Sequence, residues 1–104
     1  MIVVNTDFVP GRKIKEALGL VRGNTIQAKH LGKDIVAGFR NIVGGEIKEY
    51  TDMLSEAREV ALQRMIEKAK EMGADAVINV RFMTSAVMGG AAEILAYGTA
   101  VKLE

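Results

Sequence analysis

The chain contains no cysteine and only one histidine, His30. Without cysteine there is no disulfide, no thiolate nucleophile and no thiolate metal ligand. Such a composition fits a cytoplasmic protein, because disulfides are rare in that compartment. Soft metals bind thiolates or several imidazoles, so His30 alone is a weak metal candidate. We interpret it instead as a surface or capping residue between a strand and a helix, and we expect no metal site and no cofactor.

The chain also has almost no excess of positive or negative charge, and it has few aromatic residues. Lys and Arg number 14 against 13 Asp and Glu, which gives a net charge of +1, and aromatic residues make up 5% of the chain. Nucleic-acid binding needs a basic stripe, and the stacking of bases needs aromatic side chains beside it. Neither is visible, and no segment approaches the roughly 20 apolar residues of a membrane span. We therefore expect neither nucleic acid nor a membrane as a partner.

Signatures of catalysis are weak. A Ser-His-acid arrangement would have to combine His30 with Ser55 or Ser85, neither of which lies in a nucleophile-elbow sequence. The glycine pairs at 44–45 and 89–90 lack the Lys-Ser/Thr of a phosphate-binding loop and the spacing of a dinucleotide fingerprint. The sequence predicts no catalytic residue, and an enzyme is the last of the functional classes that we consider.

Apolar residues, in contrast, are abundant. They make up 49% of 104 residues, while charged residues make up 26%. The length predicts a single domain over residues 1–104. A domain this small has too much surface to hide so many apolar groups. We therefore expect part of them to contact another copy of the chain.

The first part of the chain reads as extended structure. Residues 2–5 predict a short strand, and Pro10-Gly11 predicts a turn. Residues 14–28 predict one long or bent strand, with a bulge or turn near a glycine. A short helix over residues 13–18 is the alternative for its first part.

Two helices follow. The first is predicted over residues 34–43, with Asp34 as its cap; Gly38 inside it indicates close approach of another backbone. The second begins at Thr51 and ends at Gly73. Its apolar stripe consists of Leu54, Ala57, Ala61, Met65, Ala69 and Met72. Further apolar residues on both sides make this arc wider than a one-sided surface helix needs, which favours a subunit contact.

The last part predicts an antiparallel hairpin with strands over residues 76–84 and 93–103. The connection, residues 85–92, is predicted to be a flexible loop. Its Val87, Met88, Gly89 and Gly90 are apolar or glycine, whereas a solvated tip is normally polar. We predict that these residues contact a neighbouring subunit or a ligand; the alternative is a loop that folds back on its own core.

Arg81 is a polar position on an otherwise apolar strand. If that face is buried, its guanidinium needs a partner, and Glu93 on the next strand is the candidate. We predict a buried Arg81–Glu93 ion pair between strands; a site for an anionic ligand is the alternative.

Four segments together resemble the YbjQ-like family, which is labelled heavy-metal-binding. They are GLVRGNTIQAKHLGKDIVAGFRNIVGGEI (19–47), EYTDMLSEAREVALQRM (49–65), GADAVINVRF (73–82) and EILAYGTAVKL (93–103), and they cover nearly the whole chain. The resemblance implies a dodecin-like α+β subunit and homo-oligomeric rings, commonly pentamers. It implies no chemistry, and the absence of cysteine weakens the metal label.

We therefore predict an α+β subunit with a small antiparallel sheet packed against one long and one short helix. The expected partner is the chain itself, as a pentamer or a decamer. The expected function is a ring-forming module that binds a small ligand or a metal ion. A purely structural or protein-interaction ring is the alternative, and an enzyme is less favoured.

The composition generates a first testable prediction. Calorimetry with Cu(I), Zn(II) and Cd(II) should show weak binding or none, because the chain has no thiolate and a single imidazole to offer. A sub-micromolar site that survives His30→Ala would contradict this prediction, since the methionines or carboxylates would then have to hold the metal.

Overall fold

The computed structural model describes residues 1–28, 42–43 and 46–104. The elements are β1 (Ile2–Val3), β2 (Ile14–Ala28), β3 (Ile42–Val43), β4 (Glu46–Ile47), α2 (Lys48–Glu71), β5 (Ala76–Met88) and β6 (Ala91–Leu103). The predicted helix over 34–43, with Gly38, lies outside the described residues except for Ile42 and Val43. Those two pair antiparallel with β4, so the end of that prediction is wrong. Ile and Val are β-branched and favour strands, which agrees with this outcome.

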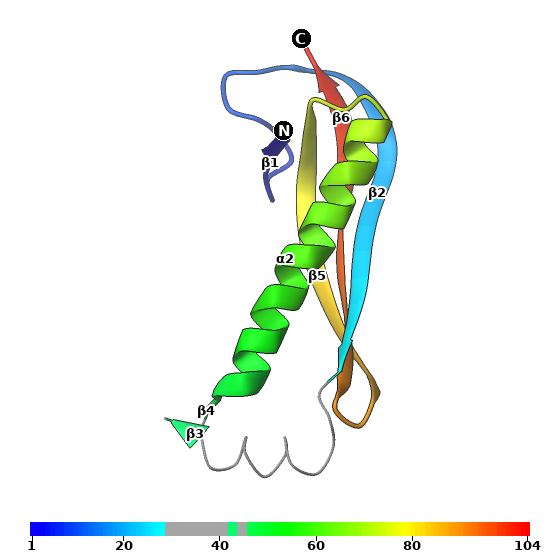
Figure 1. The fold of residues 1–104 in the computed structure, drawn as a ribbon. Helices are drawn as coiled ribbons and strands as arrows, with labels where there is room; N and C mark the ends of the chain where they lie inside the picture. The colour runs from blue at the N-terminus through cyan, green and yellow to red at the C-terminus, as the bar shows by residue number, and fades with distance from the viewer. Residues whose placement is uncertain (29–41, 44–45) are drawn as a thin grey trace.

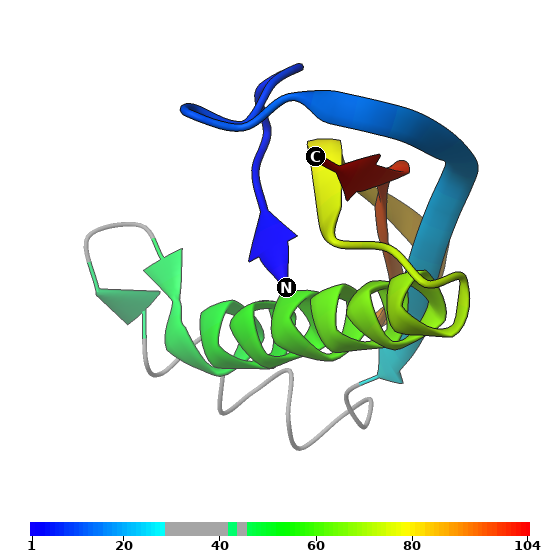
Figure 2. The ribbon, with the colours of Figure 1, turned by 90° about the horizontal axis from the view of Figure 1, so that it is seen from above.

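The structure is an α+β fold in which α2 packs on one face of a four-stranded sheet (Figures 1 and 2). The strand order is β1-β5-β6-β2. β2, β6 and β5 pair antiparallel, but β1 runs parallel to β5, so the sheet is mixed and not purely antiparallel as predicted. The short strand β1 reaches only the start of β5, pairing with Ala76 and Val77. Within the part of the chain that the structure describes, most of that edge of the sheet has no neighbouring strand.

Strand β2 confirms the prediction of one long strand with a bulge near a glycine. Its register with β6 shifts between Ala17 and Gly19, and Gly19 has a φ of +124°, which non-glycine residues rarely adopt. The alternative of a helix over residues 13–18 is wrong. The turn at Pro10-Gly11 is also present, closed by a bridge between Val9 and Arg12.

Helix α2 begins at Lys48, three residues before the predicted cap Thr51, because it follows β4 directly. Its end was predicted correctly. Gly73 has a φ of +82° and donates its N–H to the Lys70 carbonyl at 2.9 Å, while the Ala74 N–H reaches the Ala69 carbonyl at 3.0 Å. These bonds form a Schellman motif, which satisfies carbonyls at the end of the helix.

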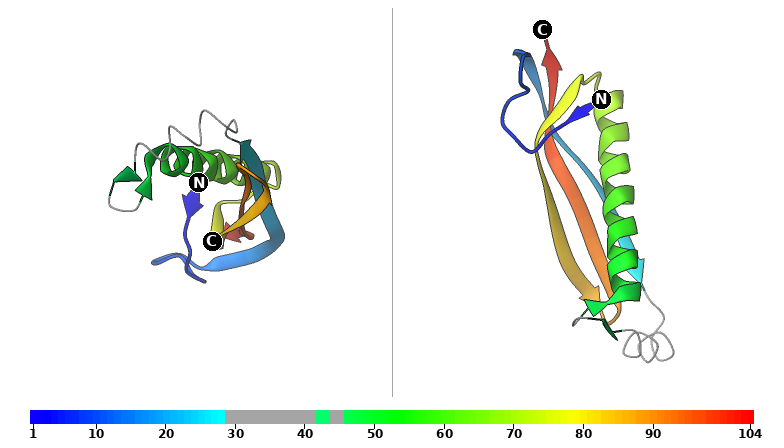
Figure 3. Two further views of the ribbon diagram at one scale, coloured as in Figure 1. Left: turned by 90° about the horizontal axis from the view of Figure 1, so that it is seen from below. Right: turned by 90° about the vertical axis from the view of Figure 1, so that its left-hand side faces the viewer.

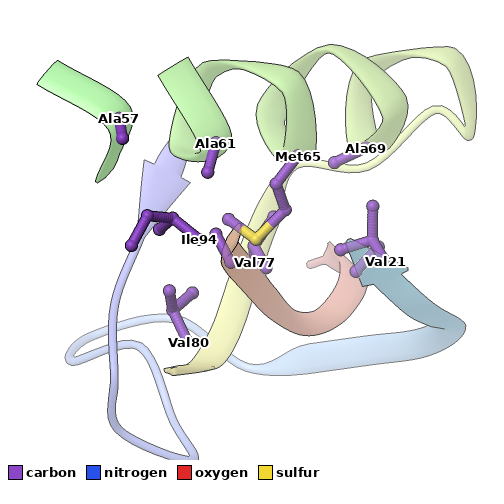
Figure 4. Packing of buried hydrophobic residues seen from close by; sticks show 10 residues of the cluster. Val21, Ala57, Ala61, Met65, Ala69, Val77, Val80 and Ile94 are labelled. Atoms are coloured by element: carbon purple, nitrogen blue, oxygen red, sulfur yellow. The ribbon is translucent and has the colours of Figure 1, made fainter. Parts of the chain in front are cut away.

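The core is built from small side chains on α2. Ala57, Ala61, Met65 and Ala69 are fully buried, which confirms the middle of the predicted stripe. They face residues of three strands, among them Val21, Val77 and Ile94 (Figure 4).

Gly23 allows the backbones of β2 and α2 to approach each other closely in this core. A Cβ at that position would overlap with the Met65 amide nitrogen and the Ala61 carbonyl oxygen, and it would lie 2.7 Å from the Arg64 carbonyl carbon. The backbone of α2 therefore rests directly on the backbone of β2.

The β5–β6 hairpin extends further than predicted. Residues 85–88 continue strand β5, with Met88 opposite Ala91, and only Gly89 and Gly90 form the turn. The predicted loop over 85–92 is therefore wrong. Pairing with β6 holds these residues extended. Because they are exposed, their sequence lacks the alternation of apolar and polar residues that indicates a half-buried strand.

The two sides of β6 are buried at different points along the strand. On one side, Ile94, Ala96 and Ala100 are buried in the cluster beneath α2. On the other side, Val101 and Leu103 are buried in a second cluster, while Leu95, Tyr97 and Thr99 are half-buried. Successive side chains of a strand point to opposite faces of the sheet. The side chains of β6 that face α2 are therefore covered by the helix, and the alternate ones lie on the outer face.

The chain folds into a long and thin shape. Its extents are 53 × 25 × 16 Å and its radius of gyration is 17.0 Å, against about 13 Å for a compact domain of this length. The hairpin and α2 run side by side along the long axis (Figure 3). This shape keeps much of the hairpin away from the core.

The contact at Gly23 generates the second prediction. Gly23→Ala should lower the free energy of unfolding by about 1–3 kcal/mol or more, because a methyl group meets backbone atoms of α2 that cannot move independently. Thermal and denaturant unfolding measure the change. Gly89→Ala is the matched control, since a Cβ there meets no atom within 4 Å. Equal stability of the two variants would contradict the close packing of α2 on β2.

Candidate functional site

The second half of β5 is an open edge of the sheet. Pairing with the N-terminal segment ends where the Asn79 N–H donates to the Thr6 carbonyl at 2.9 Å and the Val80 N–H to the Val4 carbonyl at 3.1 Å. Among the described residues, β5 pairs from Arg81 to Met88 with β6 alone, and every residue of that stretch is exposed. An edge strand with free N–H and C=O groups is a template for pairing with another chain.

A bulge at Asn79 determines how this edge is presented. Asn79 has a φ of +54°, and the register between β5 and β6 shifts between Ile78 and Arg81. Before the bulge the strand is buried; after it Phe82 is 45% exposed and Met83 52% exposed. The bulge thus separates the part of β5 that belongs to the core from the part that leaves it.

The hairpin end of β5 and the first turns of α2 enclose an apolar hollow of about 470 Å³. From α2 it is lined by Tyr50, Met53 and Leu54, from β5 by Thr84, Ala86 and Met88, and from the turn and β6 by residues 89–92. The lining is almost entirely apolar. Of the described residues that line it, Tyr50 and Thr84 bring side-chain hydroxyl groups into it.

A second apolar hollow, of about 570 Å³, lies further along the same strand. It is bounded by β5, α2 and the N-terminal segment, and its lining is Val3, Val4, Asn5, Thr6, Pro10, Leu62, Val80 and Phe82. The β5 residues of the two hollows, Val80, Phe82, Thr84, Ala86 and Met88, recur at every second position and so share one side of the strand. We call the two hollows and the open edge between them the β5 groove.

The groove exists because α2 lies over the part of the sheet formed by β2 and β6. The helix packs mainly on β2, less on β6 and least on β5. Its buried alanines and Gly23 hold it close to β2, so it cannot also cover the far edge. The inner side of β5 is consequently left open along the length of the helix.

Of the residues singled out in the sequence, Val87, Met88, Gly89 and Gly90 lie at the hairpin end of the groove. Met88, Gly89 and Gly90 line its apolar hollow, and Met88 is 69% exposed. Val87 is exposed on the same strand. The alternative that these residues fold back on their own core is wrong for Val87 and Met88.

The predicted buried pair of Arg81 and Glu93 is wrong. Arg81 is exposed and donates from Nη1 to the Asn5 carbonyl at 2.8 Å and to the Val80 carbonyl at 3.0 Å. Glu93 instead accepts from Asn24 Nδ2 at 3.1 Å. The bulge at Asn79 shifts the register, so Arg81 lies opposite Tyr97. Its guanidinium fastens the N-terminal segment to β5.

His30, the weak metal candidate, lies outside the described residues. Within residues 1–28, 42–43 and 46–104 no group of three or more His, Asp or Glu side chains is arranged to hold a metal ion. Over the same residues no helix is long and apolar enough to cross a membrane.

Sequence reasoning missed Tyr50, Met53, Leu54 and Phe82 as groove residues. Leu54 was interpreted as part of the apolar stripe of α2 and Met53 as a residue beside it, while Tyr50 preceded the predicted start of the helix. Phe82 was interpreted as part of the apolar face of a strand. The width of the arc was the available signal, because it exceeded what one sheet face can cover.

Comparison with known proteins decides the family. The family model described as "Putative heavy-metal-binding", YbjQ_1, matches residues 1–104. The chain belongs to the YbjQ family. A UPF0145 protein of Methanosarcina acetivorans is 66% identical over 103 residues, covering 99% of this chain and 97% of the relative. A UPF0145 protein of Thermotoga petrophila is 62% identical over 104 residues, covering 100% of this chain and 98% of the relative.

A solved structure supports the fold of this YbjQ chain. It is a protein of unknown function of the DUF74 family from Pediococcus pentosaceus, with a TM-score of 0.65 over 100% of this chain and 98% of the other. At 18% identity this likeness concerns the fold alone. The dodecin likeness stays a prediction. None of these names specifies an enzymatic activity, and the metal label belongs to the family as a whole.

The bulge generates the third prediction. Asn79 occupies the left-handed region, which Gly and Asn tolerate and Ala does not. Asn79→Ala should therefore lower stability by about 1–2 kcal/mol relative to Asn79→Gly, as measured by the two unfolding midpoints. Equal midpoints would mean that the backbone at residue 79 relaxes without cost, and that the bulge does not direct the strand.

Proposed function

We propose that this protein is a self-assembling module whose copies join through the β5 groove and enclose a small apolar ligand at its hairpin end. The observation that carries the proposal is the β5 strand itself. From Arg81 to Met88 it has a free edge, exposed side chains and two apolar hollows along one side.

The edge favours another polypeptide as its occupant. Free N–H and C=O groups along a strand pair with an added strand, and alternate side chains of that strand enter pockets beside the edge. The two hollows lie along the strand in the way that such a partner requires. Natural proteins protect long apolar edges with charges, proline or a cover, and beyond Arg81 this one carries neither charge nor proline.

A second copy of the chain is the cover that we propose. The subunit is thinner and longer than a compact domain of its length, which leaves its apolar groups near the surface. An assembly buries such surface, and stable interfaces bury about 1,200–2,000 Å² in total. The family resemblance makes a pentamer or a decamer the expected size.

The hairpin hollow is the proposed ligand site. Its volume of about 470 Å³ lies within the roughly 300–1,000 Å³ of small-molecule sites. An apolar lining with the hydroxyls of Tyr50 and Thr84 fits an apolar molecule with a single polar group. A neighbouring copy over the open side would exclude water from it.

The proposal generates the fourth prediction. Wild-type protein should be a ring by light scattering at micromolar concentration, and Val87→Ser/Met88→Ser should shift it to the 11.2 kDa subunit with the fold retained by circular dichroism. Loss of the Met88 side chain from the groove and of the exposed Val87 side chain beside it removes burial that the interface gains, about 1.5–3 kcal/mol per side chain. A wild-type monomer would refute the assembly.

The matched control is Leu20→Ser/Ile26→Ser. These two side chains are 70% and 58% exposed on β2, outside the groove. The control should keep the ring; equal dissociation of both variants would show that assembly does not depend on the β5 groove in particular. Native mass spectrometry of the ring reports any retained ligand. A ring that is empty when purified from its own cells would favour the alternative, a purely structural ring.

A further inference from the structure

A third hollow lies beside β2, at the edge of the sheet opposite the β5 groove, and its character is polar. Its volume is about 370 Å³, and it is lined by Arg22 and Asn24 of β2, Lys68 of α2, and Glu93 and Leu95 of β6. It shares no residue with the two hollows of the β5 groove.

Hydrogen bonds hold two of the residues that line this hollow, Asn24 and Glu93, in position. Asn24 Nδ2 donates to Glu93 Oε2 at 3.1 Å, which links β2 to β6 across the hollow. The Asn24 carbonyl accepts from Arg64 Nη1 at 2.8 Å, which links β2 to α2. Asn24 is therefore tied at both its side chain and its backbone, and the Glu93 carboxylate keeps an orientation set by Asn24.

The side chains of Arg22 and Lys68 make no hydrogen bond or ion pair with any residue in the described part of the chain. Arg64 is engaged with the backbone of β2. The lining thus contributes two unpaired cations, Arg22 and Lys68, and one carboxylate, Glu93. A positive excess beside a fixed acceptor is the electrostatic pattern for an anion that also donates a hydrogen bond.

We propose that this hollow binds a small carboxylate that carries a hydroxyl or amino group next to its negative charge. The carboxylate oxygens accept from the Arg22 guanidinium and the Lys68 ammonium, and the hydroxyl or amino group donates to Glu93. Leu95 contacts the apolar part of the molecule. A carboxylate without a hydroxyl or amino group is repelled by Glu93 and forms no hydrogen bond with it. The site therefore favours carboxylates that carry such a group.

This site is independent of the proposed assembly, because it lies on the other edge of the sheet. It also differs from the ligand site in the groove, whose lining is apolar and uncharged. Failure of one proposal therefore leaves the other in place, and light scattering on every variant reports the assembly separately from ligand binding.

The test is calorimetry of the full chain with L-lactate and propanoate at constant ionic strength. The two probes share their charge and carbon chain and differ in the 2-hydroxyl group. Lactate should bind at least about tenfold more tightly, since a hydrogen bond to a charged group corresponds to roughly that factor or more. Equal affinity for the two probes, or no lactate binding, would overturn the proposal.

Two sets of variants locate the site. Arg22→Gln/Lys68→Gln should weaken lactate binding at least about tenfold, whereas Arg58→Gln/Lys70→Gln, with the same change in net charge on exposed positions of α2, should not. An equal loss of lactate affinity in both double variants would show an unspecific effect of net charge and would refute the site. Glu93→Gln should reduce the preference for lactate over propanoate; an unchanged preference would remove Glu93 from the proposed contact.

Discussion

The contact between the α2 backbone and the β2 backbone at Gly23 determines the arrangement of the helix on the sheet. Since no side chain separates the two elements there, the helix lies low on β2, and only alanines and one methionine fit fully beneath it. A helix held this close to one edge of a sheet cannot cover the opposite edge. The open β5 groove is thus the direct consequence of tight packing elsewhere.

The same constraint separates two kinds of surface. The β5 edge is apolar and presents free backbone groups, which suits a second polypeptide. The β2 edge carries Arg22 and, from the helix beside it, Arg64 and Lys68, so its exposed charges oppose unspecific strand pairing. We therefore propose association at one edge and binding of a small charged ligand at the other.

The family label names a heavy metal, whereas the groove among the described residues is apolar. Binding of a heavy metal needs soft ligands brought together, and the described residues contain no such group. What the subunit does contain is a strand edge with apolar hollows beside it. Self-association accounts for that feature directly, which is why assembly, and not metal chemistry, stands at the centre of the proposed function.

Local signals in the sequence were sufficient for several elements. Gly73 ends α2, Pro10-Gly11 forms a turn, and β2 is one strand with a bulge at Gly19, all as predicted, because each depends on backbone preferences of neighbouring residues. The sequence also predicted the buried stripe of α2, since helical periodicity indicates which side of a helix faces a core. The stripe consists of Ala57, Ala61, Met65 and Ala69.

What the sequence by itself determined, then, is the α+β class and the elements whose ends are marked by local preferences. Only the tertiary structure decided which side of β6 faces α2, where Arg81 and Glu93 find their partners, and that residues 85–88 are strand. Those outcomes follow from the bulge at Asn79 and from the position of α2 on β2. Both involve residues distant along the chain, and the periodicity of a single segment carries no information about them.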